Sequence, residues 1–121
     1  MIETIVIDTN IIIMAFAGDK FCIMTLNGKI AVVSIITEIE LLSWPQLSES
    51  DYSILSSFLH DSFIIGLTQE IKNEVIHLRK SFSLKIPDAI IAATATTKNL
   101  TLFSSDDIFK RIPHLNFVHV I

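Results

Sequence analysis

Residues 2–10 read IETIVIDTN, and this stretch decides the fold because a run of β-branched apolar residues ends directly on an aspartate. Three further short runs have the same character: IAVV at 30–33, LTLF at 100–103 and FVHVI at 117–121. Continuous apolar runs of this length are typical of strands buried on both faces of a parallel sheet. We therefore expect strands at 2–7, 30–33, 100–103 and 117–121.

Longer segments with helical spacing separate these runs, at 9–17, 35–43, 49–60, 68–82 and 88–98. In the fourth segment Ile71, Val75, Leu78 and Phe82 mark one apolar face of a surface helix. Alternating strands and helices indicate βαβ units. The expected fold class is α/β, a three-layer α/β/α sandwich with a mainly parallel central sheet, and 121 residues fit a single domain over 1–121.

The composition is more apolar than a small domain can easily bury, with 50% hydrophobic residues and a mean hydropathy of +0.58. We therefore expect some apolar surface to meet a partner. A membrane-spanning helix needs about 20 mainly apolar residues, and no charge-free run exceeds ten, so no membrane association is expected. The first residues lack the pattern of a secretory signal, and Cys22 has no second cysteine to pair with, which favours a cytoplasmic location.

Four acidic residues stand where the predicted strands end. Asp8 directly follows the first strand, Asp106 comes just after the strand ending near residue 103, and Glu40 lies on the helix after the second strand. Asp88 follows Pro87, a residue suited to a helix's first turn. Because the crevice of an open α/β sheet lies outside the carboxyl ends of its strands, these four acids can converge there.

Clustered carboxylates repel one another and thus indicate bound cations. Ligand sets made only of oxygen suit Mg²⁺ or Mn²⁺ rather than zinc, and two such ions could assist an in-line phosphodiester displacement. The net charge of −4 argues against a protein that holds nucleic acid by a basic footprint. Without the four proposed site acids, however, 9 acidic residues stand against 9 basic ones.

Each acid also has a plain structural alternative. Asp8 could be the N-cap of the helix that follows, on about even terms with a site role. Glu40 completes a Thr37-x-x-Glu40 capping-box pattern, although a helix starting at Ser34 would leave Glu40 too far along to cap. Asp88 could simply favour the positive end of its helix. Spacing alone leaves these alternatives open.

Other catalytic patterns are missing from the sequence. Ser104 and Ser105 lack the G-x-S-x-G context of a serine hydrolase, and the three glycines are too far apart for a phosphate-binding loop. The four histidines are scattered, and none joins a nucleophile pattern: His60, His77, His114 and His119.

The motifs IVIDTNIII, SIITEIELL, IPDAIIAATA and SSDDIFKRIP occur in the order expected of a PIN domain, and the chain closely resembles VapC-type toxins from Ile5 onward. The resemblance implies an endoribonuclease that uses Mg²⁺ or Mn²⁺ and is the toxin of a type II toxin–antitoxin pair. Its four acids fall on Asp8, Glu40, Asp88 and Asp106, the last because an aromatic residue, Phe109, follows three positions later.

The resemblance also implies supporting residues and partners. Asn10 and Ser104 match polar positions that orient metal ligands or substrate in the family, with Ser104 in place of a commoner threonine. The implied partners are an RNA substrate, a small antitoxin and a second copy of the chain in a homodimer. The helix at 49–60 is the candidate partner surface, with plain core packing as its alternative. The competing function is a non-catalytic PIN-like binding module, which the acidic charge balance favours.

Overall fold

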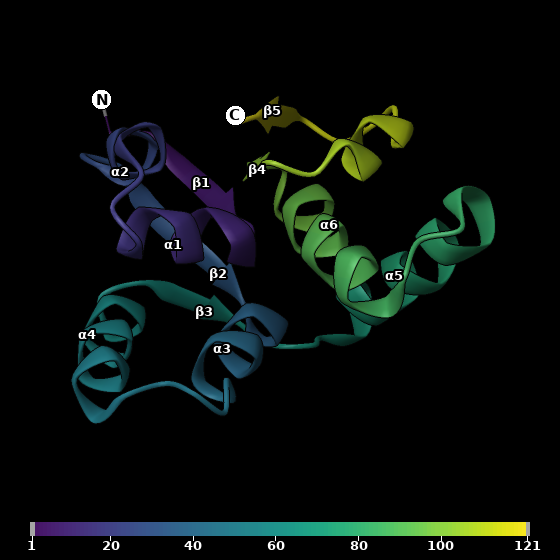
Figure 1. Cartoon of the computed structure of the whole chain (residues 1–121). Coiled ribbons are helices and arrows are strands. Elements are labelled where there is room, and N and C mark those ends of the chain that lie inside the picture. Colours follow the sequence, from purple (N-terminus) through teal and green to yellow (C-terminus); the bar gives the residue numbers. More distant parts are fainter. Residues whose placement is uncertain (1, 121) are drawn as a thin grey trace.

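The computed structural model describes residues 2–120 (Figure 1). Its elements follow one another in this order: β1 (Thr4–Ile7), α1 (Thr9–Phe16), α2 (Lys20–Leu26), β2 (Ile30–Ser34), α3 (Ile35–Leu42), α4 (Glu49–His60), β3 (Phe63–Ile65), α5 (Gln69–Phe82), α6 (Ile86–Lys98), β4 (Thr101–Ser104), the 3-10 helix η1 (Asp107–Arg111) and β5 (Phe117–His119).

The five strands form one sheet in the order β3-β2-β1-β4-β5, and every neighbouring pair is parallel. The first strand is therefore central, with β2 on one side and β4 on the other. Because all strands run the same way, their carboxyl ends share one edge of the sheet. The segments that follow β1, β2 and β4 start from that edge.

Successive residues of each strand face opposite sides of the sheet and supply two separate cores. Val6, Val32 and Leu102 pack in one cluster with residues of α5 and α6. Their neighbours Ile5, Val33 and Phe103 pack in the other cluster, with residues of α1 to α4. Figure 1 shows α5 and α6 apart from the other helices. The predicted three-layer α/β/α sandwich with a parallel sheet is therefore confirmed.

Three short elements were missing from the sequence prediction. Helix α2 has only seven residues and leaves Phe21 and Met24 each 70% exposed, so it shows no clear amphipathic period. Strand β3 is three residues long, and its Phe63 is exposed at the sheet edge. The third, η1, is a single 3-10 segment of five residues. All three are too short for periodicity to predict.

The prediction for the last strand was partly wrong. Strand β5 covers Phe117–His119 and is an edge strand whose Val118 is 40% exposed, so it is not buried on both faces. Position 121 of the predicted strand lies outside the described residues. The helix at 49–60 was the candidate partner surface, with core packing as the alternative. In the structure its residues divide between the two: Leu55 and Leu59 of α4 belong to the core, while Tyr52 is exposed.

No single helix within residues 2–120 combines the length and apolar character needed to cross a membrane; α1 and α2 reach that length and composition only as a pair bent by 117°.

Candidate active site at the carboxyl edge of the sheet

Asp8 lies at the bottom of the site, where β1 ends and α1 begins. It is the N-cap of α1, and its Oδ1 accepts a 2.7 Å hydrogen bond from the Thr9 backbone N–H. Its Oδ2 accepts a 2.6 Å hydrogen bond from the Ser104 hydroxyl, and the residue is only 6% exposed. Asp8 therefore both caps the helix and lies at the proposed site, because the turn that starts α1 places its carboxylate at the carboxyl edge of the sheet.

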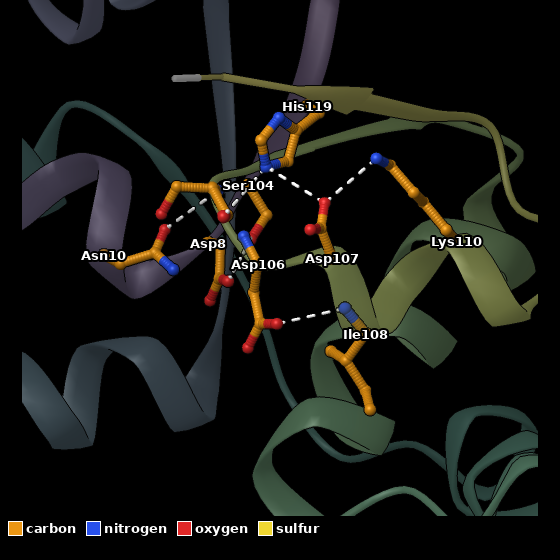
Figure 2. Close-up of polar contacts among 9 residues, drawn as sticks. Asp8, Asn10, Ser104, Asp106, Asp107, Ile108, Lys110 and His119 are labelled. Atoms are coloured by element: carbon orange, nitrogen blue, oxygen red, sulfur yellow. Dashed lines mark hydrogen bonds and ion pairs between the residues drawn. The ribbon is translucent and has the colours of Figure 1, made fainter.

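The loop after β4 carries Asp106 beside Asp8. The Ser104 hydroxyl, which donates to Asp8, also accepts a 3.0 Å hydrogen bond from the Asp106 backbone N–H. Oδ1 of Asp106 caps η1 by accepting from the Ile108 N–H at 3.0 Å. Figure 2 shows the side chains of Asp8 and Asp106 pointing the same way out of this loop region. Ser104 thus links the first and the last of the four acids.

Glu40 reaches the site from α3. This helix starts after the N-cap Ser34, so Glu40 lies too far along it to complete a capping box. Its Oε1 is instead 2.7 Å from the Thr9 hydroxyl, which also lies 2.9 Å from the buried Thr37 hydroxyl. A hydroxyl has one proton, so Thr9 donates it to the carboxylate. The residue after Asp8 therefore holds Glu40 toward the same edge.

Asp88 enters from the first turn of α6, after Pro87 at the helix start. It is half-buried, and its charge interacts with those of Asp106 and Glu40. No side chain caps this helix. The carboxylate therefore adds negative charge to the site rather than making a capping bond.

Burial and the neighbouring negative charges raise the pKa of two of the four acids, Asp8 and Asp88. Burial raises the pKa of Asp8 from 3.8 to about 6, the hydrogen bonds from Ser104 and Thr9 counteract this rise, and the charges of Asp88 and Glu40 add to it. Burial also raises the pKa of Asp88, with a further contribution from Asp106, while Lys85 opposes the rise. The site therefore has an excess of negative charge around a buried carboxylate.

The donor chemistry fits a hard divalent cation, because carboxylate oxygens are the ligands such ions prefer. The side chains are not assembled as a finished ligand set, however. Within residues 2–120, no three acidic, histidine or cysteine side chains surround a common point where an ion could bind. The acids are thus electrostatic neighbours that would have to turn inward to share an ion.

The structure separates Asp106 from its neighbour Asp107. Oδ1 of Asp107 lies 3.0 Å from Nζ of Lys110 and 3.2 Å from Nε2 of His119, and the side chain points away from Asp8 (Figure 2). Asn10 lies on the other side of the loop, with Oδ1 3.5 Å from the Ser105 N–H. This contact joins the start of α1 to the loop that carries Asp106, and the orienting role expected for Asn10 stays a prediction.

Sequence reasoning missed three polar residues of this region. Thr9 sits between two motif residues, and Thr37 was considered only as part of a capping box, although the i, i+3 spacing of Thr37 and Glu40 places both on one helix face. His119 contacts the Ser105 carbonyl from β5, and no sequence pattern indicated it. The sequence therefore contained features that could have indicated Thr9 and Thr37, but it contained none that indicated His119.

A family model described as PIN domain matches residues 5–115. Among solved structures, the chain is 30% identical to a protein in a toxin-antitoxin complex from Klebsiella pneumoniae, with 94% of this chain and 95% of that chain covered and a TM-score of 0.83. VapBC2 from Rickettsia felis, bound to a DNA fragment from its promoter, is 24% identical with coverage of 98% and 99% and a TM-score of 0.84. FitAcB from Neisseria gonorrhoeae is 21% identical with coverage of 95% and 96% and a TM-score of 0.76. No curated protein sequence gives a significant match.

Proposed function

Because this chain belongs to the PIN domain family, we propose that it is a metal-dependent endoribonuclease and the toxin of a toxin–antitoxin pair. The resemblance that the four sequence motifs indicated is thereby confirmed at the level of the family. One observation carries the nuclease proposal. Asp8, a carboxylate that is 6% exposed, faces the negative charges of Glu40 and Asp88 at one edge of the sheet.

Asp8, Glu40, Asp88 and Asp106 would hold Mg²⁺ or Mn²⁺. A bound divalent cation would lower the pKa of an attacking water and offset the charge that develops on the scissile phosphate. The chain's own residues fix the acids: Ser104 holds Asp8, and Thr9 holds Glu40. No histidine or serine is needed as a nucleophile in this scheme.

Cleavage of a mixed single-stranded RNA pool in the presence of Mn²⁺ or Mg²⁺ tests the proposal. The wild-type protein is expected to cut the RNA, and Asp8→Asn and Asp88→Asn are expected to abolish cutting because each removes one negative charge from the proposed site. Asp107→Asn is the matched control, since this adjacent acid is 71% exposed and turned toward Lys110. Equal cleavage by the wild type and both site variants would reveal a contaminating nuclease.

The alternative function is a PIN-like module that binds partners without catalysis. The acids, which surround no common ion-binding point as they stand, favour it. Calorimetric titration with Mn²⁺ separates the two functions. Binding that Asp88→Asn weakens supports the nuclease, whereas no binding at millimolar Mn²⁺ supports the module.

An apolar groove between α1, α3 and α4 supports the proposal of an antitoxin partner. It has a volume of about 290 Å³ and is lined by apolar residues with one acid at the rim: Ile13, Phe16, Ala17, Leu41, Trp44, Leu47, Asp51, Ile54 and Leu55. Trp44 and Ile54 are 48% and 52% exposed there. An apolar antitoxin segment with a basic residue facing Asp51 would fit this groove. If a short reading frame immediately upstream encodes an antitoxin, Ile54→Lys should reduce co-purification of that antitoxin with this chain.

The proposed homodimer has a second apolar surface available, on the side of α5 and α6. Leu67, Ile76 and Ile86 are each about half exposed around a hollow of about 420 Å³. These apolar side chains stand among Lys72, Arg79 and Lys80, which line the same hollow. Light scattering on the purified chain tests the dimer, and Ile76→Glu should shift it toward the monomer while Val118→Glu, on the edge strand β5, should not.

A further inference from the structure

His119 lies outside the four acids but next to the loop that carries one of them. It is the last residue of β5, where it pairs in register with Ser104. Its Nε2 is 3.0 Å from the Ser105 carbonyl oxygen and 3.2 Å from Oδ1 of Asp107 (Figure 2). Carbonyl and carboxylate oxygens only accept hydrogen bonds. The imidazole Nε2 must therefore carry a proton and donate it.

The two ends of one peptide unit are held here by two different side chains. The carbonyl of Ser105 accepts from His119, and the N–H of Asp106, which belongs to the same peptide unit, donates to the Ser104 hydroxyl at 3.0 Å. A peptide unit is planar, because resonance stiffens its C–N bond. Fixing its oxygen and its N–H therefore fixes the orientation of the whole plane and of the Asp106 Cα attached to it.

From this geometry we infer that His119 is a positioning residue for Asp106, acting through the Ser105 carbonyl. The inference rests on the proposed function in that Asp106 is taken as a metal-holding acid. The two polar contacts of His119 go to the Ser105 carbonyl and the Asp107 carboxylate, and not to the carboxylates of the four proposed site acids. His119 restricts rotation of the peptide that carries Asp106, an exposed residue whose carboxylate is bound locally by the Ile108 N–H of the next turn.

The contact with Asp107 offers a competing explanation that the structure makes testable. If His119 acted through this ion pair, it would hold η1 rather than the peptide before it. Asp107 is 71% exposed and already paired with Lys110, however, so its contact with His119 is screened by solvent. The Ser105 carbonyl is the partner through which the orientation of Asp106 can be transmitted.

The test compares His119→Ala with His119→Gln, which keeps an N–H donor at a similar reach, and with Asp107→Ala, which removes only the carboxylate contact. His114→Ala is the matched histidine control, because its ring contacts Glu74 on α5 instead. Three quantities are measured: the Kd for Mn²⁺ by calorimetry, kcat and KM on RNA, and the amide hydrogen-exchange rate of Asp106 by NMR. Exchange reports on the loop whether or not metal is bound.

Loss of a residue that orients a metal ligand typically weakens metal affinity or activity about 10- to 100-fold, so His119→Ala should raise the Mn²⁺ Kd and lower kcat by at least about 10-fold with KM nearly unchanged. The amide exchange of Asp106 should accelerate in His119→Ala. His119→Gln should restore most of each loss. The controls Asp107→Ala and His114→Ala should stay near wild type in all three quantities. Wild-type values in His119→Ala, or the same loss in Asp107→Ala, would overturn the inference. If the wild type neither binds Mn²⁺ nor cuts RNA, the proposed function fails, while the exchange rate still decides the role of His119.

Discussion

The hydroxyl of Ser104 lies 2.6 Å from Oδ2 of Asp8, although the two residues are 96 positions apart in the chain. This bond crosses between the ends of the paired strands β1 and β4. The same oxygen accepts from the Asp106 N–H. One hydroxyl therefore sets the relative placement of the two acids that come from the ends of adjacent strands.

Ser104→Ala is expected to destabilise the fold and to weaken the site. It leaves the 6% exposed Asp8 carboxylate without one of its two hydrogen-bond donors, and an unsatisfied buried acceptor costs about 1–3 kcal/mol. The pKa of Asp8 should rise further, because the Ser104 hydrogen bond now lowers it. Urea unfolding measures the first effect, and NMR titration of the Asp8 carboxyl measures the second.

Ser104→Thr is the control for that change, since it keeps the hydroxyl. It should retain the wild-type Asp8 pKa and most of the RNA cleavage. A loss in Ser104→Thr as large as that in Ser104→Ala would mean that shape, rather than the hydrogen bond, is what the site needs from this residue.

Asp8→Asn is expected to stabilise the metal-free protein at neutral pH. The folded-state pKa of Asp8, about 6, is above its ordinary value of 3.8, so ionised Asp8 opposes folding. Its contribution to stability is fully present below pH 3.8 and is lost as the pH rises through about 6. A shift of this size corresponds to about 3 kcal/mol. Asparagine caps helices as well as aspartate does, so the start of α1 is preserved.

The measurement is the difference in unfolding free energy between Asp8→Asn and the wild type, with EDTA present, from pH 3.5 to pH 8. Subtracting the two curves cancels the titration of the shared groups that do not interact with Asp8, which leaves Asp8 and its charged neighbours Asp88 and Glu40. The advantage of Asp8→Asn should grow between pH 4 and pH 7 and then level off. A difference that does not change with pH would contradict the raised pKa.

The sheet and the long helices could be predicted because their buried residues form recognisable patterns in the sequence: continuous apolar runs for the strands and helical spacing for the helices. Strand β1 is apolar on both faces, and its Ile5 and Val6 do pack in separate cores. Elements whose buried residues form no such pattern were not predicted. In α2 the exposed residues include Phe21 and Met24, which are as apolar as the buried Cys22.

The candidate site shows the same division. The placement of Asp8 and Asp106 at one edge could be predicted because each follows a predicted strand and parallel strands share their carboxyl edge. The contact of Thr9 with Glu40 joins residues 31 positions apart, and that of His119 with Ser105 depends on the register of an edge strand. Such contacts are fixed by tertiary packing, which local spacing does not encode.

Mn²⁺ is expected to raise the midpoint of thermal unfolding, because an ion that binds only the folded state stabilises it by mass action. At 100 times its Kd the gain is about 2.7 kcal/mol, on the order of 10 °C for a domain of this size. Asp88→Asn should abolish most of the rise. Asp61→Asn, at the carboxyl end of α4, is the control and should respond as the wild type does. An equal rise in all three proteins would assign the ion to another place on the chain.

The two threonines permit a test that separates stability from site function. Thr9→Val removes the hydroxyl that donates to Glu40 and leaves the fully buried Thr37 hydroxyl without its partner, so it should cost about 1–3 kcal/mol of stability and weaken Mn²⁺ binding. The double variant Thr9→Val/Thr37→Val removes both hydroxyls and should recover most of that stability, because no buried polar group is left unpaired. Its Mn²⁺ affinity should stay low, since Glu40 still lacks its donor. Unfolding curves and calorimetry on the wild type, both single variants and the double variant complete the cycle. Recovery of Mn²⁺ affinity together with stability would show that Thr9 supports the fold alone and that Glu40 needs no donor to reach the metal.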